Sequence, residues 1–196
     1  MTTPLVSVSD APLQLFDRIL RSWRIRKVRP YLRRGCSVLD IGCHDGALFS
    51  ALSDRISSGV GLDPRLERSR ARGRFRFIAD TFPSGLLGDE RFDAITLLAV
   101  LEHVEPTELP RWRDAFEQLL APEGLLIATI PSPRVDDVLD ILRSLHLIAG
   151  MSVDEHHGFD PSGVPLLFSS ASMRLIVRRR FEFGMNNLFV FKKTDH

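Results

Sequence analysis

Residues 38–46 constrain the fold of this chain more than any other segment, and they read Val-Leu-Asp-Ile-Gly-Cys-His-Asp-Gly. The apolar residues predict a buried strand, and the small and polar residues after it predict a tight turn with a helix from Asp45. Gly42 and Gly46 suit positions that need a positive φ or have no room for a side chain. Such a strand–turn–helix brings bare backbone amides and a helix N-terminus close to a ligand. The segment therefore predicts a ligand site at the end of the first strand.

Short apolar segments alternate with helix-like segments along the rest of the chain. Buried strands are predicted at residues 37–41, 59–63, 74–78, 92–98 and 124–130. Helices are predicted at residues 12–31, 45–55, 106–120 and 133–149, then a short one at 169–177 and a terminal hairpin of 179–183 and 188–192. This alternation predicts an α/β fold with a mostly parallel sheet and helices on both faces. In such a sheet, ligand-binding residues follow the carboxyl ends of the strands.

Length, charge and cysteine content indicate one ordinary domain. The chain has 196 residues, a net charge of +1 and two cysteines, Cys36 and Cys43, whose spacing fits neither a metal site nor a disulfide framework. We predict a flexible leader at residues 1–11, a single domain at 12–196 and a cytoplasmic location. No apolar run approaches the ~18 residues of a membrane span, so no transmembrane segment is predicted. The near-neutral charge gives no general argument for a nucleic-acid or membrane partner.

Acidic residues follow the first three predicted strands. Asp63 ends the second strand, 21 residues after Gly42, where a carboxylate accepts hydrogen bonds from the two hydroxyls of a ribose. Asp80 follows the third strand and is placed to accept from an adenine amino group, and Asp40 lies within the first strand. Three carboxylates repel a phosphate. The pattern therefore favours a nucleoside ligand with a cationic centre and no phosphate, with simple strand-end caps as the alternative.

The pattern resembles the class I S-adenosylmethionine-dependent methyltransferases over roughly residues 36–131. Five segments occur in the order typical of that family, and they are Val38–Gly46, Gly59–Pro64, Phe77–Asp80, Phe92–Ile95 with Val100–Val104, and Leu119–Ile127. The resemblance implies a Rossmann-like seven-stranded sheet, mostly parallel, with an antiparallel last strand supplied by the C-terminal hairpin. It also implies S-adenosylmethionine as the cofactor.

The resemblance assigns roles to the strand ends. Gly42 and Gly46 would border the methionine part of the cofactor, Asp63 would hold the ribose and Asp80 the adenine. The full expected set of cofactor-binding residues is Asp40, Gly42, Cys43, His44, Gly46, Asp63, Pro64, Asp80, Thr81 and Leu98. His44 stands where the family usually has the middle glycine of Gly-x-Gly-x-Gly, and histidine tolerates a positive φ better than most residues. A nicotinamide dehydrogenase is disfavoured, because its fingerprint needs glycines where His44 and Ala47 stand.

Three histidines are the candidates for chemistry. His103 follows the fourth strand, where it could act as a general base, or Glu102 and His103 could instead only cap and orient the loop. His156 and His157 lie in the predicted loop at 150–168, which with the helix at 12–34 is expected to cover the acceptor side. Glu102, His103, His156 and His157 could form a metal site, as in a related branch of the methyltransferase superfamily that methylates RNA ends. That branch has a glutamate where this chain has Ala99, so no metal is predicted.

The function predicted from the sequence is methyl transfer from S-adenosylmethionine to a small molecule, with O- or C-methylation favoured. No Asn-Pro-Pro-Tyr-like string, which marks amino-group methylation of bases and some proteins, follows the fourth strand. The expected partner is a small-molecule acceptor rather than a nucleic acid, and the expected state is a monomer or homodimer. Two alternatives stay open: a metal-dependent methyltransferase of a nucleic-acid end, and a non-catalytic module that binds the cofactor.

Overall fold

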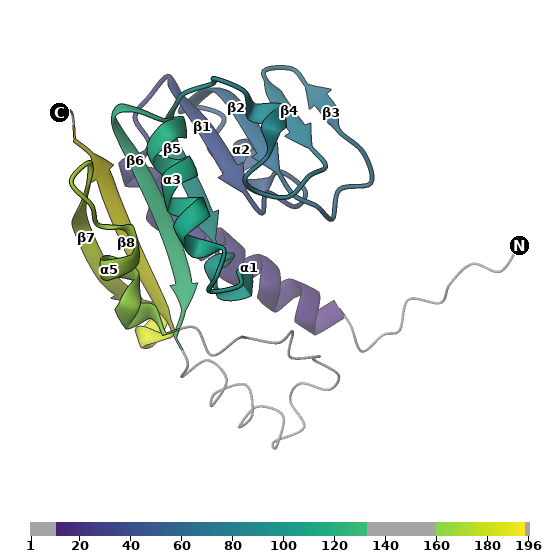
Figure 1. The fold of residues 1–196 in the computed structure, drawn as a ribbon. Coiled ribbons are helices and arrows are strands. Elements are labelled where there is room, and N and C mark those ends of the chain that lie inside the picture. Colours follow the sequence, from purple (N-terminus) through teal and green to yellow (C-terminus); the bar gives the residue numbers. More distant parts are fainter. Residues whose placement is uncertain (1–10, 133–159, 195–196) are drawn as a thin grey trace, which may run out of the picture.

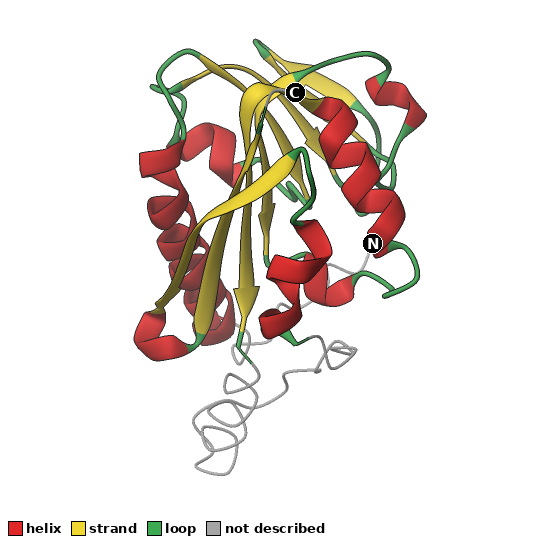
Figure 2. Ribbon diagram, turned by 60° about the vertical axis from the view of Figure 1, so that its left-hand side comes forward, coloured by secondary structure: helices red, strands yellow, loops and turns green. Residues whose placement is uncertain are grey.

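The computed structural model describes residues 11–132 and 160–194, which form an eight-stranded sheet with helices on both faces (Figures 1 and 2). The strands are β1 Cys36–Ile41, β2 Ile56–Leu62, β3 Arg70–Arg72, β4 Phe75–Ile78, β5 Phe92–Leu98, β6 Leu120–Pro131, β7 Met173–Phe181 and β8 Asn186–Lys193. The α-helices are α1 Ala11–Val28, α2 Ala47–Ala51, α3 Leu109–Leu119 and α5 Val164–Phe168. Short 3-10 helices are η1 Arg29–Tyr31, η2 Gly85–Leu87, η3 Leu101–His103, η4 Pro161–Gly163 and η5 Glu182–Gly184.

The sheet has the order β3-β4-β2-β1-β5-β6-β8-β7. The five central strands are parallel, and β8 runs antiparallel between β6 and β7. The predicted mostly parallel sheet with an antiparallel last strand is therefore confirmed. One strand, β3, was not predicted, and it pairs antiparallel with β4 at the sheet edge. All three of its residues are exposed and two are arginines, so it carries no apolar pattern.

Each face of the sheet has its own hydrophobic core. On one face, α1 and α2 contribute Val28 and Phe49, which are 0% and 1% exposed. On the other face, Phe116 of α3 and Phe168 of α5 are fully buried, with their ring centroids 5.7 Å apart. Burying a side chain of this size contributes about 1.5–3 kcal/mol relative to leaving it exposed. Helices α1 and α3 are therefore held against the sheet by apolar stripes and fix the loops at their ends.

Two expectations for the C-terminal third are wrong. The segment 169–177 was expected to be helical, but β7 begins at Met173 and its residues alternate in burial along an edge strand. The segment 150–168 was expected to be a loop, but its last part forms α5 preceded by η4, and Asp160 caps η4 by accepting from the Ser162 amide at 2.8 Å. The expected helix at 133–149 lies outside the described residues.

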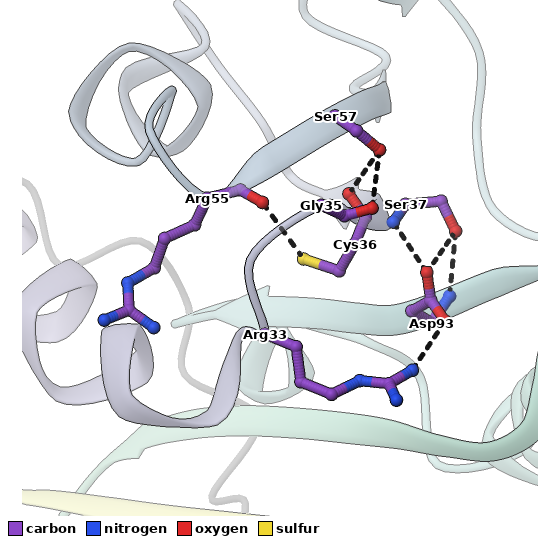
Figure 3. Close-up of polar contacts among 7 residues, drawn as sticks. All are labelled: Arg33, Gly35, Cys36, Ser37, Arg55, Ser57 and Asp93. Carbon is purple, nitrogen blue, oxygen red and sulfur yellow. Dashed lines mark hydrogen bonds and ion pairs between the residues drawn. The ribbon is translucent and has the colours of Figure 1, made fainter.

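A polar network joins β1 and β5 at their amino ends (Figure 3). Asp93 accepts from the Ser37 amide at 2.8 Å and from Arg33 at 2.9 Å, and Ser37 Oγ accepts from the Asp93 amide at 3.0 Å. Cys36 beside it is buried, and burial raises the pKa of its thiol. This end of the sheet is thus tied together by its own residues, and the ligand side of a parallel sheet is the opposite end.

None of the described helices is both long and apolar enough to cross a membrane.

Candidate nucleoside site at the carboxyl ends of the strands

The turn after β1 has positive φ at every second residue. Gly42, His44 and Gly46 have φ of 73°, 48° and 79°. His44 therefore adopts the left-handed conformation in place of a glycine, with its side chain 67% exposed. A Cβ added to Gly46 would lie 2.6 Å from a ring carbon of Phe77, so only glycine fits there without movement of the ring.

The amides of this turn bind other residues of the chain. Gly42 and Cys43 donate to the carbonyl of Leu62 at 2.8 and 3.4 Å, and His44 donates to Oδ2 of Asp63 at 2.8 Å. The expectation of bare amides is therefore wrong for these three residues. Their bonds instead fix the turn against the end of β2, because a carbonyl and a carboxylate of that strand's end accept them.

Asp63 is the buried carboxylate at the end of β2, and its side chain holds two loops together. Oδ2 accepts from the His44 amide and Oδ1 accepts from the Arg65 amide, both at 2.8 Å, and the residue is 5% exposed. An ionised carboxylate offers about four acceptor positions, so two of them stay available. A ligand hydroxyl reaching this carboxylate would meet an acceptor whose orientation is already fixed.

Asp80 follows β4 and caps its own loop. Its Oδ2 accepts from Ser84 Oγ at 2.6 Å and its Oδ1 accepts from the Thr81 amide at 2.8 Å. The hydrogen bond from Ser84, followed by the one from Thr81, lowers the pKa of this carboxyl. The side chain is ionised and partly exposed. It lies at the same sheet edge as Asp63, because the Asp63 amide donates to the carbonyl of Ile78, close before Asp80, at 3.1 Å.

Asp40 and Cys43 lie beneath the turn. Asp40 is 4% exposed and accepts from Thr96 Oγ1 at 2.7 Å. Burial raises its pKa to about 7, the Thr96 bond opposes this, and the charge of Asp63 adds to it. Burial also raises the pKa of the Cys43 thiol, so this residue packs as an uncharged group. Asp40 is engaged by Thr96 and Cys43 is an uncharged packing group, so their part in a ligand site would be to support the turn.

The loop after β5 closes the other side of the turn. A Cβ added to Gly42 would lie 2.6 Å from Val100 Cγ2, so the two loops are in contact. Ala99, the first residue after β5, has a φ of 59°, and its amide donates to the carbonyl of Thr129 at 2.9 Å. The chain therefore turns as it leaves the strand. These loops leave β1 and β5 at the position where the strand order reverses, the usual ligand site of such sheets.

The residues at this edge fit a nucleoside with a cationic centre. Asp63 keeps acceptor capacity for hydroxyls, Asp80 is an ionised acceptor nearby, and the exposed Gly42 has no room for a side chain. Carboxylates repel phosphate and attract a positive charge. The other expected contact residues, Pro64, Thr81 and Leu98, lie at the same edge, the first two exposed and the third partly buried. S-adenosylmethionine has the chemistry that this set would accept.

A buried polar cluster beside this edge was not predicted. Glu102 of η3 is 4% exposed, and burial raises its pKa to about 7 while the nearby charge of Arg24 lowers it. Burial also raises the pKa of Glu182 of η5, an effect that the charge of Arg24 partly offsets. Glu182 accepts a hydrogen bond from Asn186 Nδ2. One oxygen of each glutamate lacks a hydrogen-bond partner among the described residues. Arg24 lies on α1, and no sequence spacing connects it with these glutamates.

The expected catalytic residues are only partly described. His103 is exposed at the end of η3, next to Glu102. His156 and His157 lie outside the described residues, and so does any cluster that includes them. Within residues 11–132 and 160–194, no three His, Cys, Asp or Glu side chains are placed to hold a metal ion.

Comparison with known proteins places the chain in a class. A family model described as a methyltransferase domain matches residues 9–180. No curated protein matches the chain. Because the family model covers most of its length, the chain belongs to this methyltransferase domain family, and its fold is that of the class I S-adenosylmethionine-dependent methyltransferases.

Several solved structures share the fold. The N-methyltransferase NodS from Bradyrhizobium japonicum WM9 is 18% identical, with a TM-score of 0.59 over 92% of this chain and 97% of that one. A Burkholderia thailandensis 1,6-didemethyltoxoflavin-N1-methyltransferase, solved with its substrate and S-adenosylhomocysteine, is 17% identical, with a TM-score of 0.63 over 100% and 94%. A Methanosarcina mazei S-adenosylmethionine-dependent methyltransferase is 19% identical, with a TM-score of 0.65 over 86% and 97%.

Proposed function

We propose that this chain transfers the methyl group of S-adenosylmethionine to a small-molecule acceptor. The observation that carries the proposal is the fixed Asp63 carboxylate, buried at the end of β2 with acceptor capacity left and bonded to the turn at His44. When bound, the cofactor supplies an electrophilic methyl group on a cationic sulfur. Family membership supports this activity.

The residues at the strand ends would divide the work of binding. Asp63 would accept hydrogen bonds from the ribose hydroxyls, and Asp80 from the adenine amino group. Gly42 and Gly46 would keep the turn in the conformation that the methionine part meets, because a side chain at either position would collide with Val100 or Phe77. Methyl transfer needs mainly alignment of the two reacting atoms, so this orientation is the main contribution of the turn.

The acceptor would lie on the side of Glu102. Glu102 belongs to η3, which follows β5. The charge of Arg24 from α1 acts both on Glu102 and on Glu182 of η5. Burial there excludes water and strengthens hydrogen bonds to an acceptor. His103 is the candidate general base for a hydroxyl acceptor, with His156 and His157 as further candidates from the segment at 150–168.

A small acceptor with O- or C-methylation is the favoured chemistry. The residues after β5 are Ala99, Val100, Leu101 and Glu102, which differ from the Asn-Pro-Pro-Tyr type of string. The Burkholderia thailandensis neighbour is bound to a small molecule that it methylates on nitrogen, so a nitrogen acceptor is the competing outcome.

The proposal is tested by two measurements on the purified protein. Calorimetry with S-adenosylhomocysteine, with NADH as the control ligand, tests the cofactor site. Release of S-adenosylhomocysteine from S-adenosylmethionine with a panel of phenols, activated carbon acids and amines tests turnover, and a chelator arm tests the metal-dependent alternative. Binding without turnover on any acceptor would favour the non-catalytic module.

A further inference from the structure

The connection from β2 to β4 leaves part of the sheet uncovered. Neighbouring parallel strands are usually joined through a helix that packs on the sheet. Here the connection at residues 63–74 contains β3, which adds to the sheet edge (Figure 1). The short helix α2 is the element beside β4 on this face, and a groove of about 570 Å³ lies between α2, β3 and β4. We call it the edge groove.

Aromatic rings form the floor of the edge groove. Phe75 stacks on Phe49 with 4.8 Å between ring centroids and 13° between ring planes. Phe77 meets Phe49 edge-on at 5.9 Å. Phe75 is only partly buried, but Phe49 stacks on its ring and the Arg74 guanidinium lies over it. A planar group that enters the groove would therefore take the place of the Arg74 guanidinium.

Arg72 and Arg74 line the edge groove, and Arg70 lies beside it over the Phe77 ring. In the β3–β4 pairing, Arg70 lies opposite Phe77 and Arg72 opposite Phe75, so both arginines share a face with the rings. The guanidinium groups of Arg70 and Arg74 lie 5.3 and 5.2 Å from the centroids of Phe77 and Phe75. Arg70, Arg72 and Arg74 form no ion pair with another described residue.

Charge is divided unevenly along the chain. Residues 1–76 contain fifteen Lys or Arg against seven Asp or Glu, and residues 77–196 contain eleven against eighteen. Asp45 pairs with Arg21 at 3.0 Å and Asp54 with Arg29 at 2.8 Å, so each of these pairs leaves the excess of arginines on this side unchanged. The face made by α1, α2 and the β3–β4 hairpin is therefore basic. Such asymmetry favours an anionic partner.

We propose that the edge groove binds single-stranded nucleic acid, with a base that replaces the Arg74 guanidinium on the Phe75 ring and phosphates held by Arg70 and Arg72. Aromatic rings beneath a basic rim are how proteins bind single strands without sequence preference. A membrane surface fits less well, because the rings are recessed and the exposed apolar side chains Ile19 and Trp23, although on α1 of the same face, lie outside the lining of the groove. This inference goes beyond the proposed function and does not depend on it.

The test is fluorescence anisotropy with labelled single-stranded RNA and DNA of about 16 nucleotides, titrated at several salt concentrations. The variant R70Q/R72Q should bind at least about 10-fold more weakly, and its salt slope should fall by about 1.4, or 0.7 per lost phosphate contact. The matched control R174Q/R179Q removes the same charge from the exposed residues of β7 and should bind like the parent. Comparing the affinities for RNA and for DNA identifies which kind of single-stranded nucleic acid the edge groove prefers.

A second variant, Phe75→Leu, keeps the charge and removes the stacking surface. It should weaken binding by about 5-fold or more, with an unchanged salt slope. Equal losses in R70Q/R72Q and R174Q/R179Q, unchanged binding in R70Q/R72Q, or binding to anionic vesicles without binding to the oligonucleotides would each overturn the proposal. Unchanged S-adenosylhomocysteine affinity and thermal melting in R70Q/R72Q would confirm that the groove was tested in a folded protein.

Discussion

At the scale of single residues, the account depends on how Asp63 and Gly42 fix the turn after β1. Asp63 accepts from two backbone amides, and Gly42 touches the Val100 side chain. Both positions were predicted from the sequence, because an acidic residue at a strand tip and glycines in a turn are local signals. That the turn amides bind Leu62 and Asp63 was not predictable, since those contacts need the strands to be paired first.

Asp63→Asn should weaken S-adenosylhomocysteine binding by at least about 10-fold, or about 1.4 kcal/mol. The amide nitrogen of the new side chain would face the N–H of His44 or Arg65, and one acceptor for the ribose would be lost. Calorimetry measures the affinity, and circular dichroism checks the fold. Parent-like affinity in a folded variant would remove Asp63 from the site.

Gly42→Ala should reduce both affinity and stability. The new Cβ would lie 2.6 Å from Val100 Cγ2 at a φ of 73°, so both a clash and backbone strain are expected. The double variant Gly42→Ala/Val100→Ala relieves the clash but not the strain, so it should recover only part of the loss. Full recovery would show that positive φ has no energetic weight at this position.

Asp40 predicts a pH dependence of stability. Its pKa is raised from 3.8 to about 7 by burial, so the native state holds a proton that the unfolded state has lost between these values. The contribution of Asp40 to stability is therefore full at low pH and is lost as the pH rises through 7. Asp40→Asn should make the free energy of unfolding less dependent on pH between 5 and 8, as measured by urea titration. An unchanged pH dependence would contradict the assignment.

At the scale of elements, the prediction succeeded where pattern and burial agree. Strand β5 occupies the predicted residues 92–98, because its residues are almost all apolar and buried. Helix α2 ends at Ala51 rather than near residue 55, since turns at 52–55 lead directly into β2. The first part of β7, residues 173–177, was mistaken for a helix because edge strands alternate charged and apolar residues irregularly, with a register shift between Leu175 and Val177, whereas residues 179–181 were predicted as a hairpin strand.

The two ends of the sheet should respond differently to mutation. Asp93→Ala removes the acceptor of Ser37 and Arg33 at the amino ends of β1 and β5, so it should lower the free energy of unfolding by about 1–3 kcal/mol (Figure 3). S-adenosylhomocysteine affinity should be unchanged, because the candidate site lies at the opposite end. Denaturant unfolding and calorimetry on the same preparation measure both. A loss of affinity larger than the loss of stability explains would contradict this division.

At the scale of the whole molecule, the sequence motifs predicted the sheet and the class of ligand, but not the buried polar cluster of Arg24, Glu102 and Glu182. Arg24, Glu102 and Glu182 come from α1, η3 and η5, and only the folded topology brings them near one another. Likewise, Phe49 of α2 joins Phe75 and Phe77 of β4 only when α2 packs beside the basic β3–β4 hairpin. Residues that are local to a strand end were therefore predictable, and those assembled from distant segments were not.

The measurement that tests the central claim most directly is a calorimetric titration of the parent protein and Asp63→Asn with S-adenosylhomocysteine, with Asp93→Asn as a matched control at the other end of the sheet. The account predicts micromolar binding to the parent and to Asp93→Asn, unaffected by chelator, and at least about 10-fold weaker binding to Asp63→Asn. Absence of binding to the folded parent, or equal affinity in all three proteins, would contradict a cofactor site at the carboxyl ends of β1 and β2.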